Sequence, residues 1–104
     1  ITAAILEAMT AAKGIHADYC RIRAFPFGKK VRQFLEQHET VFVVEQNRDA
    51  QLKMLLVNEC GIDPQKLISI LHYDGNPLTE RFVTREIAEK ARLFNVTPLR
   101  KVAR

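Results

Sequence analysis

The fold is decided by the stretch Val41-Phe42-Val43-Val44-Glu45-Gln46-Asn47, in which four apolar residues run directly into three polar ones. A short run that is apolar on both faces is typical of a strand covered by helices on each side, as in a parallel sheet. The sequence therefore predicts a central strand over 41–45. In open α/β sheets ligands bind beyond the carboxyl ends of the strands, so chemistry is expected first at Glu45, Gln46 and Asn47.

The segments around this strand alternate between helix and strand patterns. Apolar residues at helical spacing predict helices over 1–13, over 29–38, from a cap at Asn47 or Asp49 to about 60, and from Thr79 to 94. The first of these helices places Ile5, Leu6, Met9 and Ala12 on one face. Two further strands are predicted over 17–23, near the edge of the sheet, and over 67–71. This order indicates an α/β protein, a three-layer α/β/α sandwich with a mostly parallel sheet and right-handed crossovers.

We expect one domain over residues 1–94, followed by a basic, irregular tail over 95–104 that contains Pro98 and few large apolar residues. The chain opens on a helix. Because α/β sheets alternate strand and helix, we expect the first strand of the sheet to lie upstream of Ile1.

The composition is that of an ordinary globular domain, with 47% hydrophobic and 27% charged residues. No apolar run approaches the roughly 18 residues that span a membrane, and the first residues lack a signal-peptide layout, so a cytoplasmic protein is expected. The net charge is +4, but without Arg100, Lys101 and Arg104 the balance is 13 basic against 12 acidic residues. This distribution argues against a nucleic-acid-binding surface.

Cysteine and histidine residues give no sign of a metal or redox centre. Cys20 and Cys60 each lie in an apolar pattern and are expected to be buried structural thiols without a disulfide. His16, His38 and His72 show no paired spacing and no nearby cysteine.

No motif of an independent enzyme is present, since the chain lacks dinucleotide, phosphate-loop and nucleophile-elbow signatures. Cys60 with His72 is a weak nucleophile–base candidate, since neither lies in a recognisable nucleophile turn. Glu45 is a stronger candidate, and three roles remain open for it: contact with a cofactor or a reacting group, an interface contact, or a structural role as a cap of the next helix or a partner of Arg21, Arg23 or Arg48.

Three segments carry a resemblance to a known family: 21–27 (RIRAFPF), 41–47 (VFVVEQN) with Gln51-Leu52 after it, and 73–79 (YDGNPLT). In this order they resemble the C-terminal part of the alpha subunit of 2-oxoacid:ferredoxin oxidoreductases, particularly the 2-oxoglutarate type. The resemblance covers about residues 1–94 and implies a domain similar to the C-terminal domain of transketolase-like thiamine enzymes.

The resemblance implies that the whole enzyme decarboxylates a 2-oxoacid on thiamine diphosphate with magnesium. Electrons then pass through an iron–sulfur cluster to ferredoxin, and an acyl-coenzyme A is formed. These cofactors, a beta subunit and the other domains of the alpha subunit are implied for the assembly. This chain alone is predicted to be inactive and to bind none of the cofactors.

Two functions from different classes therefore remain. The first is a non-catalytic assembly domain of such an alpha subunit, and the alternative is a free-standing interaction or basic-surface binding module. For the first, we expect a docking face formed by two segments that follow strand ends, since aromatic and arginine side chains are enriched in interface cores. Its candidate residues are Arg23, Phe25, Pro26, Phe27, Glu45, Gln46 and Asn47.

Overall fold

The computed structural model describes residues 2–22, 26–93 and 101–103. Its helices are α1 (Ala3–Ala12), α2 (Lys29–Gln37), α3 (Gln51–Cys60), the short 3-10 helix η1 (Pro64–Lys66) and α4 (Glu80–Leu93). Its strands are β1 (Tyr19–Cys20), β2 (Val41–Glu45), β3 (Leu67–Leu71) and β4 (Lys101–Ala103). From α1 to α4 the α-helices and strands follow one another in the order that the sequence predicts, and η1 and β4 are additional.

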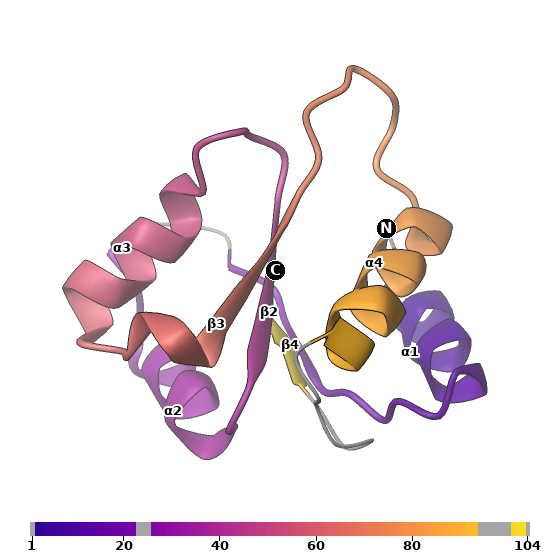
Figure 1. Ribbon diagram of the computed structural model, residues 1–104. Coiled ribbons are helices and arrows are strands. Elements are labelled where there is room, and N and C mark those ends of the chain that lie inside the picture. Colours follow the sequence, from indigo (N-terminus) through magenta and orange to yellow (C-terminus); the bar gives the residue numbers. More distant parts are fainter. Residues whose placement is uncertain (1, 23–25, 94–100, 104) are drawn as a thin grey trace.

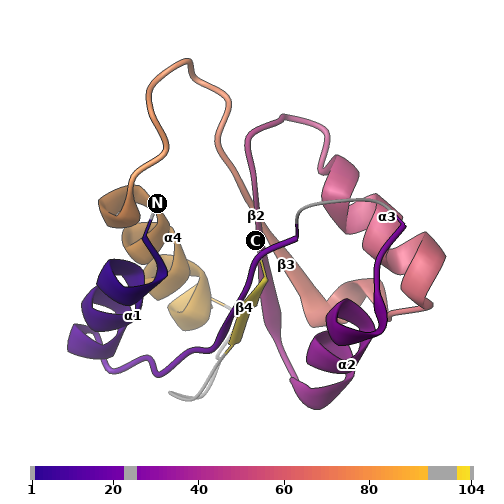
Figure 2. The same ribbon diagram turned by 180° about the vertical axis from the view of Figure 1, so that it is seen from behind.

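The strands form one sheet in the order β1-β4-β2-β3, and every neighbouring pair is parallel. Helices α2 and α3 cover one face of this sheet, and α1 and α4 cover the other (Figures 1 and 2). The predicted three-layer sandwich is thus confirmed. The central position of β2 and the edge position of β1 are confirmed as well, although β1 is shorter than the predicted strand.

Strand β2 is buried along its whole length. Phe42 and Val44 belong to the core between the sheet and α1 and α4, whereas Val41 and Val43 belong to the core on the α2 and α3 side. Successive side chains of a strand point to opposite faces, so one apolar run supplies both cores. This is the reason for its lack of alternation in the sequence.

Helix α1 buries a different face from the expected one. Leu6 and Thr10 are fully buried, but the side chain of Ile5 is 51% exposed. The Thr10 hydroxyl lies 3.0 Å from the Leu6 carbonyl oxygen and 2.9 Å from the Tyr19 hydroxyl. A polar residue therefore occupies the core position because its hydroxyl has partners in its own helix and in β1.

The tail is not irregular throughout, which corrects the expectation for 95–104. Lys101–Ala103 form β4, which pairs with β1 on one side and with β2 on the other. Backbone hydrogen bonds to both neighbouring strands stabilise β4. Because such bonds form without an apolar pattern in the sequence, the sequence gives no sign of this strand. Residues 94–100, including Pro98, lie outside the described part of the chain.

We expect Val43→Asp to destabilise the protein by several kcal/mol, because it places an unpaired charge at a side chain with 0% exposure. Met54→Asp is the matched control, since Met54 is exposed on α3. Thermal unfolding of both variants measures the difference. A melting temperature of Val43→Asp within about two degrees of the parent would contradict the central position of β2.

Candidate functional site at the carboxyl edge of the sheet

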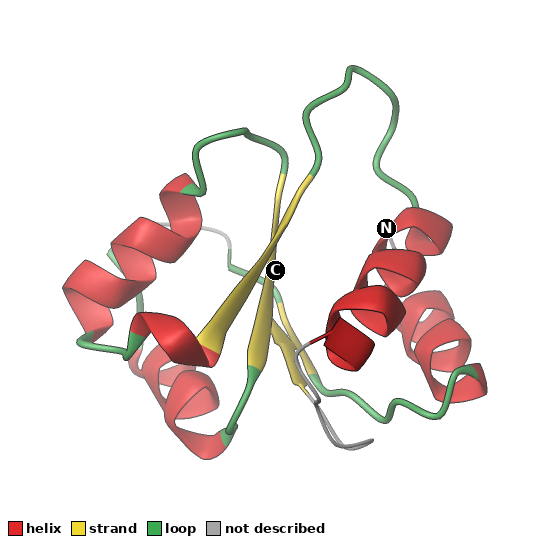
Figure 3. Ribbon diagram, in the orientation of Figure 1, coloured by secondary structure: helices red, strands yellow, loops and turns green. Residues whose placement is uncertain are grey.

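The carboxyl ends of β2 and β3 lie at the same edge of the sheet, because the two strands are parallel and in register from Val41 and Leu67 to Glu45 and Leu71. The loops that follow them project from this edge towards α3 and α4 (Figure 3). The His72 amide donates to the Glu45 carbonyl oxygen at 2.8 Å, which extends the pairing by one further bond. The edge therefore presents two adjacent loops, 46–50 and 72–79.

The carboxyl group of Glu45 lies against the first turn of α3. Its Oε1 accepts a hydrogen bond from the Leu52 amide at 2.6 Å, and its Oε2 accepts one from the Lys53 amide at 3.0 Å. Glu45 is only 5% exposed. The first amides of a helix have no partner within the helix, and Glu45 satisfies two of them from the end of the neighbouring strand.

Asn47 completes this arrangement. Its Nδ2 donates to Glu45 Oε1 at 2.8 Å, while its Oδ1 accepts from the amides of Asp49 and Gln51, each at 3.2 Å. The side chains of Glu45 and Asn47 thus accept from the first three amides of α3, those of Gln51, Leu52 and Lys53. We call Glu45 and Asn47 together the α3 cap.

The residue before α3 has an unusual backbone. Ala50 has a φ of 53°, in the left-handed region, and is the one non-glycine residue with positive φ in the described part of the chain. This conformation costs a residue with a Cβ atom roughly 1–2 kcal/mol. The α3 cap fixes the chain on both sides of Ala50, and its hydrogen bonds offset this strain.

The cap decides what this edge can do chemically. A helix N-terminus beyond a parallel strand is a common site for an anionic ligand. Here the carboxyl group of Glu45 occupies that position, so its oxygens are engaged by the backbone of α3. Of the roles that the sequence left open for Glu45, the geometry matches the cap of the following helix.

The second loop presents an aromatic side chain that the site prediction omitted. Tyr73 is 62% exposed and directly follows His72, whose Nε2 lies 3.3 Å from Asp74 Oδ1. The Asn76 amide donates to Asp74 Oδ1 at 3.0 Å, and this bond is the main cause that lowers the pKa of the Asp74 carboxyl. Tyr73 is the first residue of the third resemblance segment, which was the signal available in the sequence.

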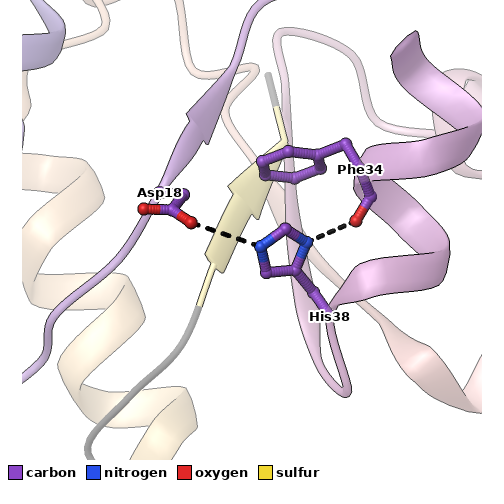
Figure 4. Close-up of polar contacts among 3 residues, drawn as sticks. All are labelled: Asp18, Phe34 and His38. Atoms are coloured by element: carbon purple, nitrogen blue, oxygen red, sulfur yellow. Dashed lines mark hydrogen bonds and ion pairs between the residues drawn. The ribbon is translucent and has the colours of Figure 1, made fainter.

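A second buried histidine lies at the opposite edge of the sheet. The His38 ring contacts the Phe34 carbonyl oxygen through Nδ1 and lies 3.4 Å from Asp18 Oδ2 through Nε2 (Figure 4). Asp18 precedes β1 and His38 precedes β2, so the contact ties the end of α2 to the amino ends of the strands. It lies away from the carboxyl ends, where α/β proteins place ligands.

The other half of the expected docking face lies elsewhere. Pro26 and Phe27 line a hollow together with Glu59 and Cys60, the last two residues of α3. Glu45 and Asn47 contact the first turn of the same helix, so the two halves lie at opposite ends of α3. The sequence places the two segments side by side only if β1 and β2 are neighbouring strands, and in the sheet β4 lies between them. Arg23 and Phe25 lie outside the described residues.

The two cysteines are free, Cys60 is buried and Cys20 is half-buried. Burial raises the pKa of both thiols, which lowers the fraction of reactive thiolate. Cys60 belongs to the core beside α3, whereas His72 packs against Phe82 of α4 on the other face of the sheet. The pair Cys60 with His72 is therefore excluded as a nucleophile and base.

Within residues 2–22, 26–93 and 101–103 no group of three or more His, Cys, Asp or Glu side chains is arranged to hold a metal ion. No helix in the same residues has the length and apolar character needed to cross a membrane.

We expect Glu45→Ala to lower the free energy of unfolding by about 1–3 kcal/mol, because it leaves two partly buried amides of α3 without an acceptor. Glu45→Gln should also destabilise, since its NH₂ group would face one of those amides. Glu59→Ala on the exposed side of α3 is the control. Denaturant unfolding gives the stabilities, and faster hydrogen exchange at the Leu52 and Lys53 amides localises the effect. Unchanged exchange there in Glu45→Ala would contradict the cap.

Comparison with known proteins finds one similar segment. The chain is 41% identical over 78 residues to the protein named 2-oxoacid:ferredoxin oxidoreductase 2, subunit alpha, from Aeropyrum pernix. This similarity covers 71% of the present chain but only 12% of that protein. No protein-family model and no solved structure matches the chain. The chain is thus similar to one short segment of an oxidoreductase alpha subunit.

Proposed function

We propose that this chain is an assembly domain of the alpha subunit of a 2-oxoacid:ferredoxin oxidoreductase and carries no catalytic group itself. The 41% identity over 78 residues to a segment of such a subunit is the observation that supports this most strongly. The three resemblance segments, which include both loops at the carboxyl edge of the sheet, support the same family. As in the sequence-based expectation, we assign the segment to the C-terminal part of the subunit and the subunit to the 2-oxoglutarate type.

The engagement of Glu45 supports the non-catalytic part of the proposal. A base or a cofactor contact needs free oxygen atoms, whereas both oxygens of Glu45 accept bonds from the backbone of α3. The buried position that would suit a phosphate group is thus taken by this side chain. Thiamine diphosphate, magnesium and the iron–sulfur cluster, which the family implies, are then held by other parts of the assembly.

For the docking face we propose the carboxyl edge of the sheet in a revised form. Gln46 is exposed, Asn47 is half-buried and Tyr73 is exposed on the adjoining loop. The Asp74 contacts with His72 and Asn76 order that loop before binding, so little entropy is lost when Tyr73 is covered. We call Gln46 and Tyr73 the edge patch, since the polar atoms of Asn47 are engaged in the α3 cap. The partners proposed for it are the other domains of the alpha subunit and the beta subunit, with ferredoxin as acceptor for the assembly.

We propose a cytoplasmic location for the enzyme. The free state of Cys20 and Cys60 is in keeping with a reducing compartment.

The native protein that contains this sequence tests the proposed function. We expect it to co-purify with a second subunit and with thiamine diphosphate, and to reduce ferredoxin in the presence of coenzyme A and a 2-oxoacid. The 104-residue chain alone should show no binding of thiamine diphosphate and magnesium in calorimetry. A native protein that is a single subunit without thiamine would favour the free-standing interaction module instead. Saturable cofactor binding by the chain alone would contradict the non-catalytic role.

We expect Tyr73→Ala in the native alpha subunit to weaken its assembly about tenfold or more, since buried tyrosines are frequent hot spots of interfaces. The melting temperature of the 104-residue chain should stay unchanged, because Tyr73 is 62% exposed there. Met54→Ala, at an exposed residue of α3, is the control. Subunit dissociation measured by sedimentation compares the two variants. Equal affinity for both would show that the docking face lies elsewhere.

A further inference from the structure

A surface groove runs between α1 and α4, which lie side by side on one face of the sheet (Figures 1 and 2). Its volume is ≈ 610 Å³. Met9 and Ala88 contribute apolar surface, and four cationic side chains, Lys13, Arg81, Arg85 and Arg92, line it as well. The groove shares no residue with the edge patch or the α3 cap.

Most of these cations have no carboxylate partner in the described chain. The acidic residues of α4 are engaged: Glu86 pairs with Lys90 at 3.2 Å, Glu89 pairs with Arg92 at 3.5 Å, and Glu80 accepts from the Thr2 amide at 2.7 Å. Within the residues that the structure describes, Lys13, Arg81 and Arg85 form no ion pair with a carboxylate. The groove therefore carries an excess of positive charge.

The apolar part of the groove is also incompletely covered. Ile5 is 51% exposed and lies one turn before Met9 on the same side of α1, so the two side chains form an apolar stripe. Thr84 lines the groove and is only 4% exposed, yet its hydroxyl has no hydrogen-bond partner among the described residues. A buried hydroxyl without a partner in the chain is a position where a bound group would supply one.

The length of the cationic row indicates the size of the occupant. Arg81 and Arg92 are eleven residues apart in α4, which corresponds to about 16 Å at 1.5 Å per residue. A single phosphate group would reach only one or two of these side chains. Carboxylates spaced at successive turns along a helix match the whole row, and an apolar stripe beside them matches Ile5, Met9 and Ala88.

We propose that the groove between α1 and α4 binds an acidic amphipathic helix of a partner polypeptide. Arg81, Arg85 and Lys13 pair with its carboxylates, and its apolar side chains pack on Met9 and Ala88. A second copy of this chain is a poor occupant. Its four α-helices carry at most three acidic residues each, and those of α4 are already engaged.

A designed peptide tests this proposal directly. The probe is a fluorescein-labelled helix of about 18 residues, or about five turns, with glutamates one turn apart beside a leucine stripe. Its sibling peptide carries lysine in place of every glutamate. Fluorescence anisotropy with the 104-residue chain should show saturable binding of the acidic peptide only, and binding should weaken between about 50 and about 200 mM salt.

Variants of the chain locate the binding. The double variant Arg81→Glu with Arg85→Glu should weaken binding by at least about tenfold, because it reverses two charges of the groove. The double variant Lys29→Glu with Lys30→Glu, at the exposed start of α2 on the opposite face, should bind as the parent does. Thermal unfolding of both variants confirms that they are folded, as expected for exposed positions.

Four results would overturn the proposal. Equal binding of the acidic and lysine peptides would show that the groove does not recognise its ligand by charge. Equal loss of binding in both double variants would show that the peptide does not bind in the groove. Inorganic tripolyphosphate that binds the groove more tightly than the acidic peptide would make it a small-anion site, and self-association that depends on Arg81 and Arg85 in sedimentation would assign it to a second copy.

Discussion

The burial of β2 on both of its faces is the constraint on which the rest of the structure depends. Phe42 and Val44 fill the core under α1 and α4, while Val41 and Val43 fill the core under α2 and α3. All five residues of β2 are therefore buried. The alternation of side chains also decides that Glu45, two residues after Val43, points towards α3.

Glu45 links the sheet to the α2 and α3 layer. Its carboxyl oxygens accept from amides seven and eight residues further along the chain, so the end of β2 and the start of α3 are held together by side-chain contacts. The left-handed Ala50 lets the chain turn tightly enough for this. A feature that in many α/β proteins binds a ligand thus serves here to hold the fold.

Two surfaces remain available for partners once the cores and the cap are accounted for. The edge patch lies at the carboxyl ends of β2 and β3, and the cationic groove lies between α1 and α4. The first is aromatic and polar, whereas the second combines a row of cations with an apolar stripe. The two proposed surfaces thus differ in chemistry as well as in place. The chain spans 12% of the length of the alpha subunit to which it is similar.

The sequence by itself determined the elements whose signals are local. The apolar run of β2, the helical spacing of α2 and α4 and the alternation of helix and strand are sufficient for the three-layer sandwich. The segments 21–27, 41–47 and 73–79 carry the resemblance to a known family. The tertiary structure decided what depends on distant residues. Lys101–Ala103 become a strand because β1 and β2 leave a gap between them, and Thr10 is buried because the Tyr19 hydroxyl meets it.

Glu45 could be named as a cap, an interface residue or a catalytic group from its place in the sequence, and only the positions of the Leu52 and Lys53 amides distinguish these roles. Pro26 and Phe27 lie beside the last residues of α3 and not beside its first turn, and β4, which no local pattern predicts, separates β1 from β2.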